Sequence, residues 1–281
     1  MTSNILTDHR GPVLWITLNR PEAKNAFTLE MGTELLKAVR QGMKEKGTAV
    51  IAITGAGETF SAGGDIKLMS RTQKPKGFFL KISRLVNTVV LEMQNGGKPV
   101  IAAIPGYVGG IAFGMVLGAD LRIASTEAKF NAATIRLGLV ANGGATYFLP
   151  RLVGLARASE ILLLGDILSA EEALKTGLIN RVVSLTELES TVQEMAERLA
   201  SGPRRALGRL KKIIRQGLHS SLSAQLERER QAIAWSATTP DFREGIIAFL
   251  EKRRPNFRED TRQAPRSISS PLRGRSSVSC R

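Results

Sequence analysis

A short apolar run, a glycine-rich loop and a helical pattern follow one another twice in the first half of the chain, and this succession limits the fold more than any other feature. The apolar runs, each of strand length, cover residues 49–54, 99–104 and 121–124. Glycine-rich loops follow the first two runs at 55–65 and 106–118, and apolar residues recur at helical spacing over 78–93. The alternation of buried strands with helices predicts an α/β fold.

Further elements are predicted on both sides of these repeats. Residues 5–18 alternate loosely around a His-Arg-Gly-Pro turn and predict a β-hairpin, and Thr28 is placed to cap the helix that follows it. From Gly154 onward the apolar residues recur at helical spacing, which predicts a helical layer. The helices predicted there cover residues 155–164, 169–176, 185–200, 203–217, 221–236 and 240–252.

These patterns divide the chain into three parts. Residues 1–200 are expected to form the main core, and residues 201–257 a C-terminal helical region. Residues 258–281 are rich in Ser, Arg and Pro and have little to bury, so we expect them to be disordered.

The formal net charge of +15 is high for a chain of 281 residues. It favours an anionic partner, either a phosphorylated small ligand or a nucleic acid. Cys280 is the only cysteine, so a disulfide within the chain is excluded. We find neither a leader peptide nor a run of about 18 apolar residues, so we expect a cytoplasmic protein without a membrane span.

Several common chemistries lack their motifs in this chain. No G-x-G-x-x-G dinucleotide fingerprint and no G-x-S-x-G nucleophile elbow occur. The two histidines, His9 and His219, are too few and too far apart in sequence to predict a metal site.

Two glycine motifs are the candidates for a functional site. The first is TFSAGGDIK at 59–67 and the second is PGYVGGIAFG at 105–114, and each joins a predicted strand to a helix. Backbone N–H groups at such a turn point toward one spot, although a glycine turn by itself is usually structural. Two such turns in one α/β domain could direct two N–H donors at a single oxygen, which is an oxyanion hole.

These segments and several others resemble the crotonase family, whose members are enoyl-CoA hydratases and isomerases. The similarity runs from about residue 5 to 257. The matching segments are NRPEAKNA at 19–26, FSAGGDIK at 60–67, GYVGGIAFG at 106–114, GLVANGGA at 138–145, LPRLVG at 149–154, DFREG at 241–245 and FLEKR at 249–253.

The resemblance implies a spiral of ββα units with a C-terminal helical trimerisation region, and a homotrimer or a dimer of trimers. It implies an acyl-CoA substrate, with CoA as part of the substrate and no permanently bound cofactor. The thioester oxygen would accept hydrogen bonds from the N–H groups of Gly64 and Ile111. The residues implied in binding CoA are Lys24, Ala26, Ala62, Asp65, Ile66, Gly110, Phe249 and Lys252.

The chain departs from the family at its acid and base positions. The family's hydratases use two glutamates, which match Gly114 and Thr134 here, and some isomerases use an aspartate that matches Asn142. An amide cannot act as a base at neutral pH. Thr134 and Asn142 could still hydrogen-bond a water or a substrate group. Alternatively, Thr134 caps the next turn and Asn142 adopts a left-handed conformation before Gly143.

Other acids are expected to have structural roles. Asp65 is expected to bond the backbone of its own turn, Asp120 to mark the start of a strand, and Glu92 to lie on a solvated helix face. The sequence therefore nominates no replacement for the absent glutamates.

Three functional hypotheses remain. The favoured one is an enoyl-CoA hydratase- or isomerase-like enzyme that stabilises an enolate with non-standard acid and base residues. The second is an acyl-CoA-binding protein of the same fold with little catalysis, since losing general acid–base catalysis usually costs about 10²–10⁴-fold in rate. The third is an RNA-binding relative, which the net charge suggests but no recognition motif supports.

Overall fold

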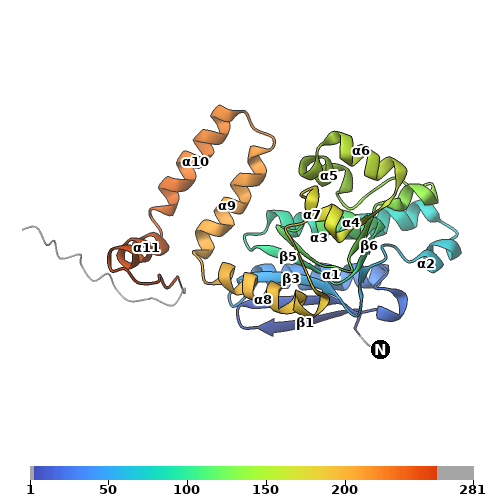
Figure 1. The fold of residues 1–281 in the computed structure, drawn as a ribbon, viewed down its shortest axis with the longest axis horizontal. Helices are drawn as coiled ribbons and strands as arrows, with labels where there is room; N and C mark the ends of the chain where they lie inside the picture. The colour runs from blue at the N-terminus through green and yellow to red at the C-terminus, as the bar shows by residue number, and fades with distance from the viewer. Residues whose placement is uncertain (1–2, 258–281) are drawn as a thin grey trace, which may run out of the picture.

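The fold is taken from a computed structural model that describes residues 3–257. The predicted disorder of residues 258–281 lies outside the described residues, as does Cys280. Two sheets, a layer of helices around them and a protruding helical hairpin make up the described chain (Figure 1).

The strands form one large and one small sheet. In the large sheet the order is β1-β2-β3-β5-β7-β10, and in the small sheet it is β4-β6-β8-β9. The strands of the large sheet are β1 (Ile5–Arg10), β2 (Val13–Leu18), β3 (Val50–Gly55), β5 (Val100–Ile104), β7 (Leu121–Ser125) and β10 (Arg181–Val183). Those of the small sheet are β4 (Thr59–Ser61), β6 (Tyr107–Gly109), β8 (Lys129–Asn131) and β9 (Ile167–Ser169).

Helices connect and cover these strands. The helices up to the end of the core are η1 (Pro21–Ala23), α1 (Leu29–Lys44), α2 (Ile66–Arg71), α3 (Pro75–Asn95), α4 (Gly110–Leu117), η2 (Ala133–Leu137), α5 (Ala145–Val153), α6 (Leu155–Leu164), α7 (Ala170–Lys175) and α8 (Leu185–Ala200). Three more follow, namely α9 (Arg204–Gly217), α10 (Leu222–Ser236) and α11 (Pro240–Leu250). None of the helices within residues 3–257 is both long and apolar enough to cross a membrane.

The predicted hairpin and helix cap are confirmed. β1 and β2 pair antiparallel through a turn in which Gly11 has a φ of 59°, a conformation that glycine adopts without steric cost. The Thr28 side chain accepts a hydrogen bond from the Met31 N–H at 3.2 Å, so it caps α1 as expected.

The predicted spiral of ββα units is confirmed as well. Each of β3, β5 and β7 belongs to the large sheet and leads directly into a three-residue strand of the small sheet, and a helical segment follows that strand. Within the large sheet β2, β3, β5, β7 and β10 pair parallel, which requires these crossovers. Within the small sheet β4, β6 and β8 also pair parallel.

Several elements were missed by sequence periodicity. The small sheet consists of strands of three residues, too short for a periodic signal, and two of these strands lie inside segments predicted as glycine-rich loops. The prediction of helices alone after Gly154 is incomplete, because β9 and β10 lie there. Helix α5, which contains Pro150, was not predicted from periodicity, although the resemblance to the family implied a helix after the loop at 138–145.

The core lies on both faces of the large sheet. Along β2, Leu14 and Ile16 face one hydrophobic cluster while Val13 and Trp15 face the other, because successive side chains of a strand point to opposite faces. Helix α8 covers the second cluster. The first cluster contains α4, whose residues from Ile111 to Leu117 are all buried.

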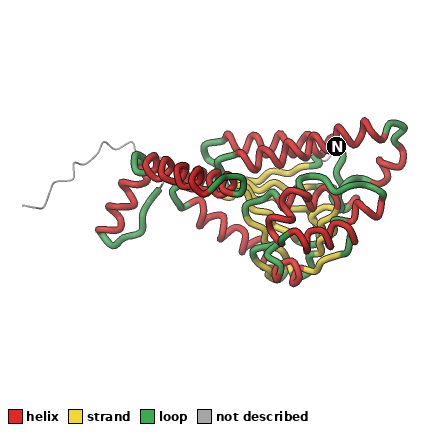
Figure 2. Tube along the Cα trace, turned by 90° about the horizontal axis from the view of Figure 1, so that it is seen from above, coloured by secondary structure: helices red, strands yellow, loops and turns green. Residues whose placement is uncertain are grey.

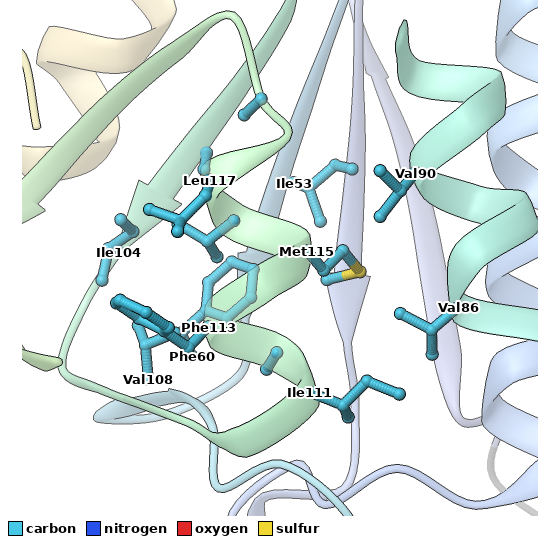
Figure 3. Close-up of a cluster of buried hydrophobic side chains, with 14 of the residues drawn as sticks. Ile53, Phe60, Val86, Val90, Ile104, Val108, Ile111, Phe113, Met115 and Leu117 are labelled. Atoms are coloured by element: carbon cyan, nitrogen blue, oxygen red, sulfur yellow. The ribbon is translucent and has the colours of Figure 1, made fainter. Parts of the chain in front are cut away.

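Figure 3 shows the position of α4 in this first cluster. Its side chains lie between Ile104 and Val108 on one side and Val86 and Val90 of α3 on the other. A helix that is apolar on every side is stable only when it is buried in this way.

The last three helices form an arm, which we define as residues 201–257. The arm extends away from the sheets, and α11 lies at the end of the molecule farthest from α2 (Figures 1 and 2). No described residue after Ala200 belongs to either hydrophobic cluster. The arm therefore contributes no described side chain to the two hydrophobic clusters, and other contacts join it to the sheets.

Polar contacts join α9 to the core. Lys211 is 8% exposed. Its ammonium donates to the carbonyl oxygens of Met93 and Lys98 at 2.7 Å each and pairs with the Asp120 carboxylate at 2.7 Å. Arg215 contacts the other Asp120 oxygen and the Gln94 carbonyl. These residues surround the C-terminal end of α3, where cations complement the helix dipole.

Candidate functional site

The first glycine motif follows β4 and turns into α2. Phe27 forms an isolated parallel bridge with Gly64, in which the Phe27 N–H donates to the Gly63 carbonyl at 2.7 Å and the Asp65 N–H donates to the Phe27 carbonyl at 3.2 Å. In a parallel bridge the partner residue's own N–H and carbonyl point to the opposite side. The Gly64 N–H therefore points away from Phe27, toward a cavity that Gly64 lines.

The second glycine motif follows β6 and turns into α4. Gly110 has a φ of 51° and begins the helix, so Ile111 is its second residue. The first N–H groups of a helix have no acceptor within the helix, which leaves the Ile111 N–H free to bind a ligand oxygen. Ile111 is 5% exposed and also lines the cavity.

The fold brings these two turns together. β4 and β6 are parallel neighbours, so their carboxyl ends lie at the same edge of the small sheet. A Cβ atom at Gly63 would lie 2.8 Å from the Gly109 carbonyl oxygen, and one at Gly109 would lie 2.9 Å from the Ala62 oxygen. The two backbones approach so closely that only glycine fits at these positions.

The cavity has a volume of about 420 Å³, within the range of small-molecule sites. It is lined by all four predicted catalytic residues, Gly64, Ile111, Thr134 and Asn142. Three of the residues predicted to bind CoA, Ala62, Ile66 and Gly110, also line it. Its described lining is Ala62, Gly64, Ile66, Met69, Phe79, Ile82, Ser83, Tyr107, Gly110, Ile111, Asn131, Thr134, Arg136, Leu137, Leu139, Val140 and Asn142. No Asp, Glu, His or Cys is among these described lining residues.

Gly114, which the resemblance matches to a family glutamate, has no space for a side chain. A Cβ atom at Gly114 would lie 2.2 Å from the Asn142 carbonyl oxygen and 2.9 Å from the Ala145 N. One at Gly143 would lie 2.6 Å from the Ile111 oxygen. The loop at 142–144 therefore packs directly on α4, in the space that a side chain at position 114 would need.

The Asn142 side chain is only half satisfied. Its amide nitrogen donates to the Ser83 hydroxyl at 3.2 Å, whereas its carbonyl oxygen is buried and has no partner among the described residues. The alternative of a left-handed Asn142 is wrong, because the positive φ values fall on Gly143 (66°) and Gly144 (97°). Ser83 lies on α3. It was not predicted as a site residue, because nothing in the helical pattern distinguishes it from other polar residues of that helix.

Thr134 lines the cavity but caps no helix. Its hydroxyl donates back to the Ala132 carbonyl at 3.2 Å, and its N–H bonds the same oxygen at 2.7 Å. The Thr134 methyl group lies 3.8 Å from where a Cβ of Gly110 would be, close to the second turn.

Tyr107 and Arg136 are the ionisable side chains of the described lining. Burial raises the pKa of the Tyr107 phenol above its usual range, while a hydrogen bond from Asn131 opposes the shift. Tyr107 is therefore protonated at neutral pH and acts as a donor. Tyr107 lies within the second glycine motif, but no role was predicted for it from the sequence. Arg136 forms an exposed ion pair with Asp166 at 2.9 Å.

The N-terminal signature supports the first turn. The buried Asn25 amide donates to the Ala56 and Thr59 carbonyls at 2.9 and 2.7 Å, and its oxygen accepts from the Arg20 N–H at 2.9 Å. Lys24 is exposed with a φ of 50°, and its carbonyl accepts from the Ala62 N–H at 2.9 Å. The signature and the first glycine motif are thus joined through the backbone.

Asp65 has the structural role expected for it. One carboxylate oxygen accepts from the Leu68 N–H at 3.1 Å and caps α2, and the other pairs with Arg20 at 3.2 Å. The neighbouring Ile66 is 54% exposed beside the cavity, whereas Ala26 is buried.

The other two acids also hold the structure together. Asp120 accepts from the Val100 N–H at 2.8 Å at the start of the β5–β7 pair and binds Lys211 and Arg215. Glu92 pairs with Arg40 at 2.7 Å at the surface of α3.

Phe249 and Lys252 are not brought to the cavity of their own chain. Phe249 lies on α11 and is 81% exposed, and Lys252 follows that helix with a φ of 54°. Figure 1 places α11 at the opposite end of the molecule from α2, which borders the cavity.

No metal site is present in the part of the chain that the structure describes: nowhere do three or more His, Cys, Asp or Glu side chains gather closely enough to bind an ion. His9 pairs with Glu45 at 3.3 Å, and His219 contacts the Tyr147 hydroxyl.

The similarity to known proteins extends over nearly the whole chain. The family model described as enoyl-CoA hydratase/isomerase matches residues 8–261. The chain therefore belongs to the enoyl-CoA hydratase/isomerase family, as its motifs indicated.

Three relatives illustrate the range of this family. The 1,2-epoxyphenylacetyl-CoA isomerase of Escherichia coli K12 is 37% identical over 92% of this chain and 99% of its own length. The trans-2-decenoyl-[acyl-carrier-protein] isomerase of Streptococcus mutans is 32% identical over 90% of this chain and 97% of its own. The crystal structure of an enoyl-CoA hydratase from Bacillus anthracis superposes with a TM-score of 0.87 at 34% identity, covering 90% of this chain and 98% of that one.

Proposed function

We propose that the chain is an enoyl-CoA isomerase- or hydratase-like enzyme that binds an acyl-CoA thioester and stabilises its enolate. The observation that carries this proposal is the pair of glycine turns at the ends of the parallel strands β4 and β6, after which Gly64 and Ile111 line one cavity. Their N–H groups are proposed to bind the thioester oxygen there. Two preorganised donors bind a developing oxyanion more strongly than a neutral carbonyl. The C2 proton of a bound thioester therefore becomes more acidic.

The lining favours isomerisation over hydration. Hydration needs a group that activates water and a second group that delivers a proton, and the described lining holds no carboxylate or imidazole. Isomerisation of a 3-enoyl thioester moves one proton from C2 to C4 through the enolate. Hydroxyls and amides from Tyr107, Thr134 and Asn142 surround the cavity and can hold the water that carries this proton.

A second candidate is an acyl-CoA-binding protein with little turnover. The same lack of a carboxylate in the described lining favours it, since the oxyanion hole would still bind the thioester. Nucleic-acid binding is not favoured, because the relatives described above are named for acyl thioesters.

We propose that residues of the core and residues of the arm both bind CoA. Lys24, Ala62 and Ile66 lie near the first turn, where the pantetheine and nucleotide of a bound ester would leave the cavity. Phe249 and Lys252 are too far away in the same chain, so we propose that they reach this nucleotide from a neighbouring subunit of a trimer. Exposed apolar side chains on the arm support such assembly, among them Leu222, Ile233, Phe249 and Leu250.

Turnover beside binding tests the function. Wild type is expected to bind crotonyl-CoA more tightly than crotonate and to isomerise a 3-enoyl-CoA faster than it hydrates a 2-enoyl-CoA. Asn142→Asp adds a carboxylate with little change of shape, and it should raise the isomerisation rate by about 10²-fold or more. Equal affinities for crotonate and crotonyl-CoA would contradict the proposed oxyanion hole. Tight binding with no turnover in either form would establish the second candidate.

Deamidation of Asn142 must be excluded before a weak wild-type activity is credited to the amide, because Asn142 precedes a glycine. Intact-mass analysis of the tryptic peptide separates the two forms. Asn131→Asp provides a control, because this second amide of the lining lies on β8 and not on the loop packed against α4.

A further inference from the structure

Six basic residues and no acidic residue lie between residues 66 and 84, directly after the first glycine turn. They are Lys67, Arg71, Lys74, Lys76, Lys81 and Arg84, and all six side chains are exposed. None of them takes part in the ion pairs that the described residues form. We call this surface, on α2 and the first half of α3, the basic rim.

The basic rim adjoins the cavity. The same two helices line it with Ile66, Met69, Phe79, Ile82 and Ser83. On α3, Lys81 and Arg84 are three residues apart and so share one face, pointing away from the buried Ile82. Lys74 directly precedes the helix as its N-cap.

The orientation of a bound thioester decides what the basic rim meets. When the carbonyl lies at Gly64 and Ile111, the acyl group fills the cavity. The group outside is then the carrier to which the acyl chain is attached. This step rests on the proposed function.

The basic rim is too long for a nucleotide alone. Lys74 and Arg84 are ten residues apart, about 15 Å along the axis of α3, and α2 extends the surface further. Exposed aliphatic side chains lie among the cations, with Leu80 64% exposed and Leu68 41% exposed. Aliphatic groups between charges suit a protein surface better than RNA, whose bases are bound by stacking on aromatic rings.

We propose that the basic rim binds an acidic protein that carries the acyl group as a thioester on its own prosthetic group. Opposite charges would orient this carrier protein so that its prosthetic group enters the cavity beside Ile66. The thioester carbonyl would then reach Gly64 and Ile111. CoA esters would use the same oxyanion hole without needing the cations of α3.

Kinetics on two carriers test the proposal. The probe is one enoyl group attached either to CoA or to the phosphopantetheine arm of an acidic acyl carrier protein. The variant is Lys74→Glu/Lys81→Glu/Arg84→Glu. The control is Lys37→Glu/Lys46→Glu/Lys175→Glu, three exposed lysines without ion pairs that change the net charge equally.

We expect the variant to lower kcat/KM on the carrier-protein thioester by at least about tenfold, as loss of electrostatic steering would, with little change on the CoA ester. Rising salt should remove the wild-type preference, since exposed charges are screened. Equal effects of the variant and the control, or equal losses on both carriers, would overturn the proposal. A variant that loses only binding to single-stranded RNA or to anionic phospholipid vesicles would overturn it as well.

Failure of the proposed function can be told apart from failure of this inference. If wild type turns over neither thioester, the proposed function fails, and docking is measured directly as the Kd for the acidic carrier protein. A Kd that rises at least about tenfold in the variant alone would support the basic rim, and an unchanged Kd would exclude it.

Discussion

The core and the arm are both made of regular elements, yet they are stabilised in different ways. In the core, large side chains such as Phe113 and Phe60 are 0% and 1% exposed. In the arm, the buried hydrophobic residues within the described chain are Ala232 and Ala248, and Phe249 is 81% exposed. The core is held by burial of apolar surface, whereas the arm is attached through Lys211, Arg215 and Asp120 and leaves its apolar surface exposed.

This difference teaches where chemistry and assembly reside. The cavity, both glycine turns and the loop at 142–144 belong to the core. The arm has an exposed apolar surface. We propose that another copy of the chain covers this surface. Activity and assembly should therefore respond to different mutations.

Core and arm phenylalanines should differ most in stability. Phe113→Ala removes a fully buried ring from the first cluster and should lower the free energy of unfolding by about 3–5 kcal/mol. Phe249→Ala alters an exposed ring and should change it by less than about 0.5 kcal/mol. Urea unfolding at one low protein concentration measures both. Similar losses for the two variants would show that the arm is packed as a core is.

Asp120→Asn tests the attachment of the arm. It leaves Lys211, which is 8% exposed, and Arg215 without their carboxylate, and we expect a loss of about 3–5 kcal/mol. Cleavage by trypsin near residue 200 should accelerate while the core stays intact. Glu227→Gln removes the partner of Arg230 within the arm and serves as the control, with an unchanged unfolding midpoint. Cleavage that is equally slow in both variants would rule out the ionic attachment.

Lys211 also predicts a dependence on pH. Burial lowers the pKa of Lys211 to about 8. The unfolded chain keeps this lysine charged up to about pH 10.4, so the unfolded state binds more protons between these values. The contribution of Lys211 to the free energy of unfolding therefore rises with pH, by about 2 kcal/mol between pH 8 and about 9.5. Below pH 8 it is constant.

The measurement is the difference in unfolding free energy between wild type and Lys211→Met across this range, which cancels the other titrating groups. A difference that stays flat, or falls as pH rises, would contradict the assignment of the lowered pKa to Lys211.

The smallest effect expected concerns substrate binding by the arm. If Phe249 contacts the nucleotide of a neighbouring subunit's ligand, Phe249→Ala should raise KM for a CoA ester about fivefold, equivalent to about 1 kcal/mol, and leave kcat unchanged. Leu163→Ala, at a core side chain that is 71% exposed, is the control for a general surface effect. A fall in kcat with an unchanged KM would place Phe249 in the chemistry instead.

Sequence patterns predicted most of the large elements. The buried strands at residues 49–54 and 99–104 were found within one residue of β3 and β5, and the helices of the arm within about two residues. The motifs also identified the family, which the match of the family model over residues 8–261 confirms. The short strands of the small sheet were missed because three residues carry no periodicity.

The candidate site was predicted unevenly. Gly64, Ile111, Thr134 and Asn142 do meet in one cavity. The Ser83 hydroxyl that binds Asn142 comes from a residue 59 positions away and leaves no local signal. The occupation of the space at Gly114 by the 142–144 loop also has no local signal, because it depends on the approach of two backbones.

By itself the sequence determined the local conformations: where strands and helices run, where Thr28 caps a helix, and where glycine permits a turn. These follow from side-chain spacing and backbone sterics within a few residues. Only the tertiary structure decided which segments meet. It placed Asn142 against Gly114, joined Lys211 to Asp120 and left Phe249 far from its own cavity. Such contacts depend on steric fit and charge between distant segments, which spacing along the chain does not encode.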